Sequence, residues 1–217
     1  MGPVWQLPDF GGARRTGLGT VHCAGLRKSR AWQDSPTPPP PDNPLSRAPP
    51  SQVLVSGDRD GHIKMWNDEG SCIHDVQGHA GAVFALCAHG SVLCSGSRDN
   101  TIKVWDATSL TCEATLSGHT DSVWSLCMGN GLLYSGSDDN TVRVWDVSQE
   151  ECLGVLEGHT CAVTAVAFHD GRLFSGSYDD TVRVWDPRAQ RCERTCEGHT
   201  DAVCMVLVSS AGQPVLG

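Results

Sequence analysis

The sequence contains no apolar run long enough to form a membrane-spanning helix. Such a helix needs about 18 or more consecutive apolar residues, and no stretch of the 217-residue chain approaches that length. The amino terminus also lacks the charged and apolar regions of a secretory signal peptide. Gln6 stands where a myristoylated terminus would have Ser or Thr. We therefore expect a cytoplasmic protein, with the nucleus as the alternative, and no membrane partner.

Positive charge is also scarce. The chain has 16 Lys and Arg against 25 Asp and Glu, for a net charge of −9 at pH 7. Residues 1–50 hold six of the basic residues and only three aspartates, so the acidic excess falls on the rest of the chain. An acidic surface repels nucleic-acid phosphates. We therefore expect no nucleic-acid partner.

Cysteine is abundant, with 11 in the chain, but its spacing argues against disulfides and metals. Cys72, Cys112, Cys152 and Cys192 recur every 40 residues, and equivalent sites on neighbouring repeats lie farther apart than the ~5.5–6 Å between Cα atoms that a disulfide prefers. Cys196 is four residues beyond Cys192, roughly 13 Å along a strand, whereas two thiolates on one zinc must lie under about 5 Å apart. We expect small buried thiols in a reducing compartment, with no metal and no other cofactor.

The most informative pattern is a repeat of Gly-His pairs every 40 residues. The last three pairs each begin 12 residues after a Trp-Asp pair. In register, the units read SGSRDNTIKVWD, SGSDDNTVRVWD and SGSYDDTVRVWD, with a degenerate fourth copy, SGDRDGHIKMWN, that ends at Asn67. Repeats of about 40 to 45 residues with this signature are typical of propeller blades that contain four strands each. The pairs end at His79, His119, His159 and His199.

On these motifs, the chain resembles the WD-repeat β-propeller family from about residue 52 to its end. The resemblance implies an all-β fold of about four blades, each with four antiparallel strands. Residues 1–50 are rich in Pro and Arg and are predicted to be a disordered tail. The predicted propeller, 51–217, divides into the units 51–79, 80–119, 120–159, 160–199 and a partial unit 200–217.

Counting strands in these units gives sixteen, and the first unit lacks its first strand. The sixteenth strand, at residues 201–208, leaves two arrangements open. It completes the first unit and closes a four-blade ring, or the chain is a partial propeller from a larger one. We favour the partial propeller, a truncated isoform. The alternative for its function is that such an isoform has none of its own, because unpaired edge strands invite aggregation.

Each full repeat places a Ser, a His and an Asp where they converge, which invites comparison with a hydrolase triad. The trio occurs three times, however, and no GxSxG element surrounds the serines. The resemblance implies a structural tetrad instead, in which Trp donates to Ser, Ser to His and His to Asp. We therefore predict no enzyme activity. The predicted tetrads are His79/Ser95/Asp99/Trp105, His119/Ser135/Asp139/Trp145 and His159/Ser175/Asp179/Trp185, with Ser137 as an alternative to Ser135.

The first unit has Ser56, Asp60 and Trp66 but no histidine upstream of them. His199 would fill this place if the ring closes. Without closure, Trp66 and Asp60 are expected to lose a partner, at about 1–3 kcal/mol for each buried unsatisfied group.

Two sets of residues are candidates for partner binding on the Gly-His face. In each first strand, the apolar spacing Val-x-x-Φ-x-Φ contains one residue more than strict alternation allows, which predicts a β-bulge. The resemblance to the WD-repeat family implies that the residue after each Val and the residue before each turn Asp lie near the mouth of the central channel, where a protein or peptide would bind. The first set is Phe84, Trp124 and Thr164, and the second is Arg59, Arg98, Asp138 and Tyr178.

Among WD-repeat proteins, the blades are similar to those of F-box ubiquitin-ligase substrate receptors and of the ring-finger TNF-receptor-associated factor. F-box propellers that read phosphorylated peptides carry arginines at both sets of positions, and here only Arg98 and Arg59 match. We therefore expect a peptide with an apolar anchor, and a scaffold or adaptor role that includes ubiquitin-ligase components as partners. No F-box is visible, and residues 1–50 contain too few Cys and His for a RING.

Overall fold

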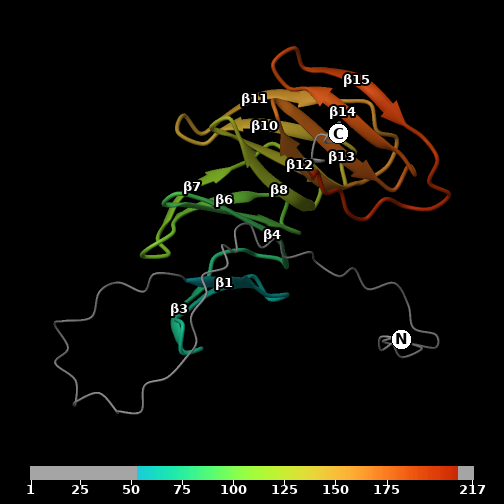
Figure 1. Ribbon diagram of the computed structural model, residues 1–217. Helices are drawn as coiled ribbons and strands as arrows, with labels where there is room; N and C mark the ends of the chain where they lie inside the picture. The colour runs from blue at the N-terminus through green and yellow to red at the C-terminus, as the bar shows by residue number, and fades with distance from the viewer. Residues whose placement is uncertain (1–52, 210–217) are drawn as a thin grey trace, which may run out of the picture.

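The computed structural model describes residues 53–209 and consists of fifteen β-strands, with no helix in that range. The strands form one sheet of three strands and three sheets of four, each antiparallel and each made from consecutive strands. The predicted all-β propeller fold is confirmed, whereas the predicted disordered tail at 1–50 lies outside the described residues. Figure 1 shows the sheets following one another as blades.

We number the blades I to IV along the chain. Blade I contains β1 (Leu54–Gly57), β2 (His62–Trp66) and β3 (Cys72–Gln77). Blade II contains β4 (Val83–His89), β5 (Val92–Ser97), β6 (Ile102–Asp106) and β7 (Cys112–Leu116). Blade III contains β8 (Val123–Gly129), β9 (Leu132–Ser137), β10 (Val142–Asp146) and β11 (Glu151–Leu156). Blade IV contains β12 (Val163–His169), β13 (Arg172–Ser177), β14 (Val182–Asp186) and β15 (Arg191–Cys196).

The core lies between neighbouring blades because alternate side chains of each strand point to opposite faces of its sheet. In β10, Val142, Val144 and Trp145 are at most 2% exposed. One cluster joins residues of β4 to β7 with Val123, Leu126 and Trp145 of the next blade. Burial of these side chains supplies the main favourable contribution to blade-on-blade packing.

The hairpins between the second and third strands of each blade use the turn chemistry that the sequence predicts. Asn100, Asn140 and Asp180 have φ of 70°, 69° and 64°, and Gly61 has φ of 90° at the same place in blade I. Asn, Asp and Gly are the residues that most readily adopt this left-handed conformation. The repeated Asp-Asn, Asp-Asp and Asp-Gly pairs therefore set the position of each turn.

The predicted β-bulges are also present. Pairing of the first and second strands shifts register between Val83 and Ala85 in blade II, and blades III and IV shift at the equivalent place. The extra residues of the three bulges are Phe84, Trp124 and Thr164. A bulge redirects its extra side chain, so these three do not follow the alternation of their strands.

The predicted sixteenth strand is absent, since residues 201–209 form no ladder. Val203 is nevertheless 5% exposed and packs against Gly176, as Val163 packs against Gly136. Its N–H donates to the Ser177 carbonyl at 2.9 Å. The segment thus starts in the place of the innermost strand of a next blade but lacks a second strand with which to pair.

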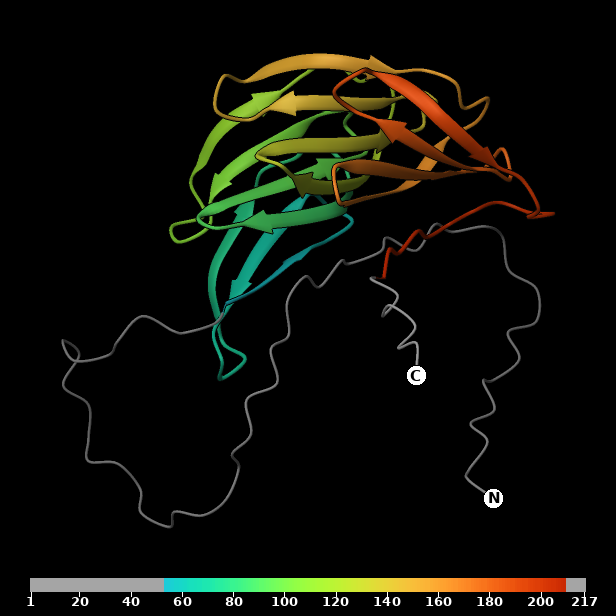
Figure 2. The ribbon, with the colours of Figure 1, turned by 45° about the horizontal axis from the view of Figure 1, so that its top comes forward.

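The blades form an open arc, as Figures 1 and 2 show, so the partial propeller and not the closed four-blade ring is the arrangement of this structure. His199 is exposed and does not reach blade I. The expected loss of two partners in blade I is also wrong. Trp66 Nε1 still donates to Ser56 Oγ at 2.9 Å, and Asp60 is exposed to solvent, so neither is a buried unsatisfied group.

Candidate functional site

The candidate tetrad of blade II forms one continuous hydrogen-bond chain from its core to its surface. Trp105 Nε1 donates to Ser95 Oγ at 2.8 Å, and Ser95 Oγ lies 2.7 Å from His79 Nε2. His79 Nδ1 lies 2.9 Å from Asp99 Oδ2, at the turn between β5 and β6. The geometry fits a Trp-to-Ser-to-His-to-Asp direction of donation.

Blades III and IV repeat this geometry with their own residues. The His Nε2–Ser Oγ distances are 2.6 and 2.7 Å, and both His Nδ1–Asp Oδ2 distances are 2.7 Å. In every case the first serine of the Ser-Gly-Ser element takes part. The second serine, Ser137 in blade III, instead accepts from the Asp139 N–H. The residues are His119, Ser135, Asp139 and Trp145 in blade III and His159, Ser175, Asp179 and Trp185 in blade IV.

A fifth member of each tetrad was missed by sequence reasoning. Thr101 Oγ1 donates to Asp99 Oδ1 at 2.6 Å, and Thr141 and Thr181 do the same in their blades. Their recurrence every 40 residues was the available signal. Blade I has His62 at this place, and its Nδ1 lies 2.7 Å from Asp75 Oδ1 on β3 instead.

The tetrad aspartates are held ionised. Burial opposes the charge of Asp99, but hydrogen bonds from Thr101, the Ala80 N–H and His79 outweigh it and lower the pKa of Asp99 to about 2. The same causes lower the pKa of Asp139 and Asp179. Burial lowers the pKa of His79, and the neighbouring Asp99 only partly offsets this effect. The pKa of His159 is lowered for the same reason, so the tetrads of blades II and IV favour a neutral histidine beside a carboxylate.

This arrangement does not prepare a serine for nucleophilic attack. Ser95, Ser135 and Ser175 are each 0% exposed, and each hydroxyl oxygen already accepts an indole N–H. A nucleophile must reach a substrate carbonyl, which these oxygens cannot do from inside the blade. The tetrads therefore act as internal braces that hold the turn, the Gly-His loop and the third strand together.

The bulge residues of blades II and III lie side by side. The rings of Phe84 and Trp124 stack with centroids 4.2 Å apart and an interplanar angle of 1°. Both side chains are half-buried. Within residues 53–209, no acceptor lies within hydrogen-bond distance of the buried indole nitrogen of Trp124. An indole N–H buried without an acceptor is a cost to the free protein.

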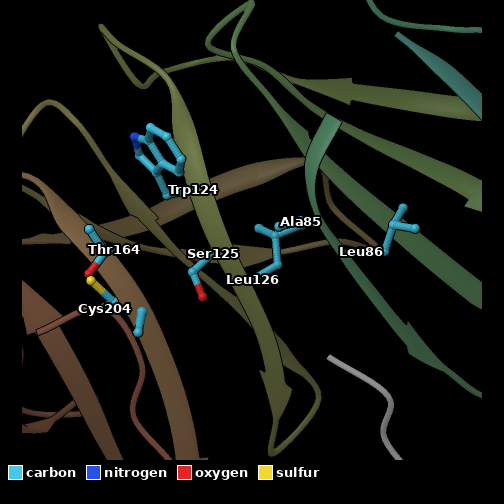
Figure 3. A pocket seen from close by; sticks show the side chains of 8 residues that line it. Ala85, Leu86, Trp124, Ser125, Leu126, Thr164 and Cys204 are labelled. Carbon is cyan, nitrogen blue, oxygen red and sulfur yellow. The ribbon is translucent and has the colours of Figure 1, made fainter. Parts of the chain in front are cut away.

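Trp124 and Thr164 also line a small, narrow hollow, shown in Figure 3. The hollow is formed by β4, β8 and β12, the first strands of blades II to IV, and Cys204 of the segment after β15 completes it. Ser125 Oγ accepts the Val166 N–H at 3.1 Å, which links blade III to blade IV beside it. The lining residues are Ala85, Leu86, Trp124, Ser125, Leu126, Thr164, Ala165 and Cys204.

The second predicted set consists of the residues that precede each turn Asp, at the hairpin turns. The N–H groups of Arg98, Asp138 and Tyr178 each donate to the carbonyl of the residue that precedes a bulge Val, at 2.9–3.0 Å. Arg59 and Arg98 are exposed, and within the described chain neither guanidinium makes a hydrogen bond or an ion pair. No contact joins the two arginines, so their joint grip on an anion stays a prediction.

A second, larger hollow lies between blades III and IV and was not predicted. It includes Tyr134, Leu153 and Arg188, and Gln190 Nε2 crosses from blade IV to donate to the Leu153 carbonyl at 2.8 Å. Its residues differ from one repeat to the next, which is why the repeat pattern gave no signal for it.

The expectation that the repeated cysteines are buried is wrong. Cys72, Cys112 and Cys152 are exposed on the outer strands, and Cys192 is only partly buried. Each sulfhydryl donates to the carbonyl two residues further on, at 3.2–3.5 Å. The outer strand is the solvent edge of each blade, so its first residue has no neighbouring strand to cover it. All ten cysteines of the described chain are free.

Two further features are absent from residues 53–209. No three His, Cys, Asp or Glu side chains are grouped so as to hold a metal ion. None of the described segments is a helix with the length and apolarity to span a bilayer.

The repeated sheets, hairpin turns and Trp-Ser-His-Asp chains define a β-propeller of tetrad-braced blades. The family described as WD domain, G-beta repeat matches four segments, 41–67, 70–106, 110–146 and 150–186. These segments cover more than half of the chain. The chain therefore belongs to the WD-repeat family, whose repeats serve as scaffolds for protein interaction.

A comparison with solved structures shows the same architecture. The chain is similar to the crystal structure of the computationally designed Ika8 protein, with 34% sequence identity and a TM-score of 0.68. The match covers 73% of this chain and 50% of that one, so the matched blades span half of the Ika8 chain. A comparison with curated proteins gave no match. No comparison points to F-box or ring-finger WD proteins in particular.

Proposed function

We propose that this chain is a non-enzymatic interaction module that binds a protein or peptide on its Gly-His face. The observation that carries the proposal is the Phe84–Trp124 stack beside the hollow lined by Thr164 and Cys204. The three bulge residues project from strands whose other apolar positions fill the core. The aromatic character of Phe84 and Trp124 is therefore not needed for the alternation that builds the blades.

The chemistry of this surface favours a ligand with an apolar side chain and a nearby hydrogen-bond acceptor. The two stacked rings offer apolar area, and aromatic side chains are enriched among the residues that dominate binding energy. The indole nitrogen of Trp124 is buried, so a ligand carbonyl would supply the acceptor that this donor lacks once binding turns the ring outward. Exposed Arg59 and Arg98 on the turns of the same face would favour acidic residues flanking the anchor.

A peptide-display selection on the full chain tests this proposal. Selected peptides should share an apolar residue, and Trp124→Ala should weaken their binding about tenfold or more while the thermal melt stays unchanged, because an anchor residue is typically worth 2 kcal/mol or more. Ile73→Ala is the matched control, since Ile73 is an exposed apolar residue on the outer strand of blade I. Peptides that bind Trp124→Ala as tightly as the original chain would contradict the site.

We further propose that the module serves as the substrate-recognition or adaptor part of a ubiquitin-ligase or signalling complex in the cytoplasm or nucleus. This finer assignment is an analogy at the level of the fold. Free thiols throughout the described chain favour a reducing compartment. Co-purification of ligase subunits with the full chain in cells, retained by Ile73→Ala, would support the assignment. Failure to recover any ligase subunit would count against it.

The alternative class, a propeller hydrolase, makes a distinct prediction. A hydrolase would have one serine that reacts with an activity probe, whereas the three tetrad serines are equivalent and buried. Labelling of a single serine by a fluorophosphonate probe would contradict the non-enzymatic proposal.

A further inference from the structure

The two ends of the described arc are unfinished in complementary ways. Blade I has its second, third and fourth strands, and β1 has no partner on the side where an innermost strand would lie. At the other end, residues 201–209 start in the place of an innermost strand, and no strand of the described range 53–209 pairs with them. One end lacks the element that the other end presents.

Exposed apolar side chains concentrate at these two ends. Leu207 is 90% exposed, Met205 63%, Leu54 59% and Val53 39%. They account for four of the seven large apolar residues that the described chain exposes. Leu93 of blade II and Leu133 of blade III occupy the place of Leu54 in their blades, and they are 2% and 0% exposed. The sequence therefore places core-type residues at both ends, and nothing within residues 53–209 covers them.

We propose that a second copy of this chain covers them, by reciprocal exchange of residues 201–209. The segment of one copy pairs with β1 of the other as its missing innermost strand, and the second copy does the same for the first. Two arcs of four blades then form a closed ring of eight. Joining the ends of like chains head to tail gives a closed assembly only when the rotation closes, and propellers of up to eight blades exist.

The register of this pairing follows from the repeat. In blade II, Leu86 lies opposite Ser95 and Ala88 opposite Leu93. Val206 and Val208 occupy the places of Leu86 and Ala88 in their repeat, and Ser56 and Leu54 occupy those of Ser95 and Leu93. The same pairing therefore places Val206 opposite Ser56 and Val208 opposite Leu54 of the second copy. Leu207 is then opposite Val55, and every residue of β1 gains a partner. The pairing alternates as in the other blades. Met205 and Leu207 are larger than the residues at their places in blade II, Ala85 and Cys87, and methionine adapts to irregular gaps.

The same exchange supplies the histidine that blade I lacks. Four residues before Val203 stands His199, just as His79 stands four residues before Val83. In the exchanged strand, His199 would meet Ser56 and Asp60 of the second copy, next to the existing Trp66–Ser56 hydrogen bond. The fourth tetrad thus forms between two chains, so blade I is incomplete without the second copy.

The match to the designed Ika8 protein agrees with a ring built from two copies of this chain. The four blades match 50% of that chain at a TM-score of 0.68, so the matched part of this chain corresponds to half of the larger chain. Two copies supply the other half.

Three other occupants of the two ends are conceivable, and each predicts a mass other than that of a dimer. They are residues 201–209 folded back onto their own blade I, a segment of this chain outside the described residues, and blades of another chain.

The test is the mass of the purified full chain, measured by light scattering over a series of concentrations. We expect a plateau at twice the 23.2 kDa of one chain. Leu207→Asp should raise the Kd for dimer formation by about tenfold or more at each of the two joints, because it replaces a buried leucine by a carboxylate. Leu207 is exposed in the single chain, so this variant keeps its fold. Leu153→Asp, at an exposed leucine of the outer strand β11, is the matched control.

Hydrogen exchange locates the contact. Amides of residues 204–208, and those of residues 54–57 that do not donate to β2, should be protected in the dimer and lose this protection in Leu207→Asp, while those of β9 and β10 stay protected. A single-chain mass at every concentration would overturn the proposal. So would a dimer that Leu207→Asp leaves intact, or a mass that rises with concentration without a plateau, which would indicate open chains instead of a ring.

Discussion

Replacing His119 by alanine tests the bracing role of the tetrads most directly. The His119 side chain is 1% exposed, and it joins β9 and the turn that follows it to the Gly-His loop. Its Nε2 lies 2.6 Å from Ser135 Oγ, and its Nδ1 lies 2.7 Å from Asp139 Oδ2. The substitution removes both hydrogen bonds and leaves a space beside Trp145, whose ring centroid is 6.0 Å from that of the imidazole.

The expected loss follows from these contacts. A hydrogen bond to a charged group contributes about 1.5–3 kcal/mol and a neutral one about 0.5–1.5 kcal/mol. Asp139 keeps the N–H and hydroxyl of Thr141 and the N–H of Thr120, so the carboxylate is not stranded. Ser135 likewise keeps the indole N–H of Trp145. We therefore expect His119→Ala to lower the free energy of unfolding by about 3 kcal/mol, which corresponds to roughly 6–12 °C in Tm for a domain of this size.

The assay is urea unfolding of the full chain, followed by tryptophan fluorescence and by circular dichroism. His89→Ala is the matched control, because His89 is exposed at the end of β4 and surface substitutions usually change stability by less than about 0.5 kcal/mol. A loss in His119→Ala no larger than that of the control would refute the bracing argument. It would mean that the hydrogen bonds add little beyond the packing of Trp145.

Acid should destabilise the blades in two steps. The buried histidines of blades II and IV, whose pKa values are lowered from 6.5, contribute stability that is lost as the pH falls below 6.5. The contribution of Asp99 is lost further down, between its ordinary value of 3.8 and about 2. Urea titrations between about pH 4 and 8 check the first step, and constant stability there would contradict it. Thiol reactivity should divide by position: native protein should be alkylated at exposed Cys112 and not at Cys94, where burial raises the pKa to about 12. Mass spectrometry of the labelled peptides decides this, and equal labelling would contradict the packing.

Local signals in the sequence were enough to predict the blades. The alternation of β6 and β10, the Asn and Asp residues at the hairpin turns and the extra residue after Val83 each depend on a few neighbouring positions. Repetition reinforced them, because each pattern occurs several times at a spacing of 40 residues. The burial of the repeated cysteines could not be read in this way, since it depends on whether another strand lies beside β7 or β11.

The candidate site was only partly accessible from the sequence. The positions of Phe84 and Trp124 followed from the bulges, but their mutual stacking depends on how blade II sits against blade III. The threonines at the tetrads carried a visible periodic signal that was not used. The hollow beside Leu153 and Gln190 has no periodic signal at all, because it is formed by side chains that differ between repeats.

The sequence by itself determined the strands, the turns, the bulges and the composition of each tetrad, since all of these depend on residues within one repeat. Only the tertiary structure decided that the arc stays open and that His199 does not reach Ser56. The physical reason is that closure depends on the angle between successive blades. That angle is set by the packing of whole sheets against one another, through contacts such as Val163 on Gly136 and Val203 on Gly176. Small differences in these contacts accumulate from blade to blade, so the total angle cannot be inferred from the sequence of one repeat.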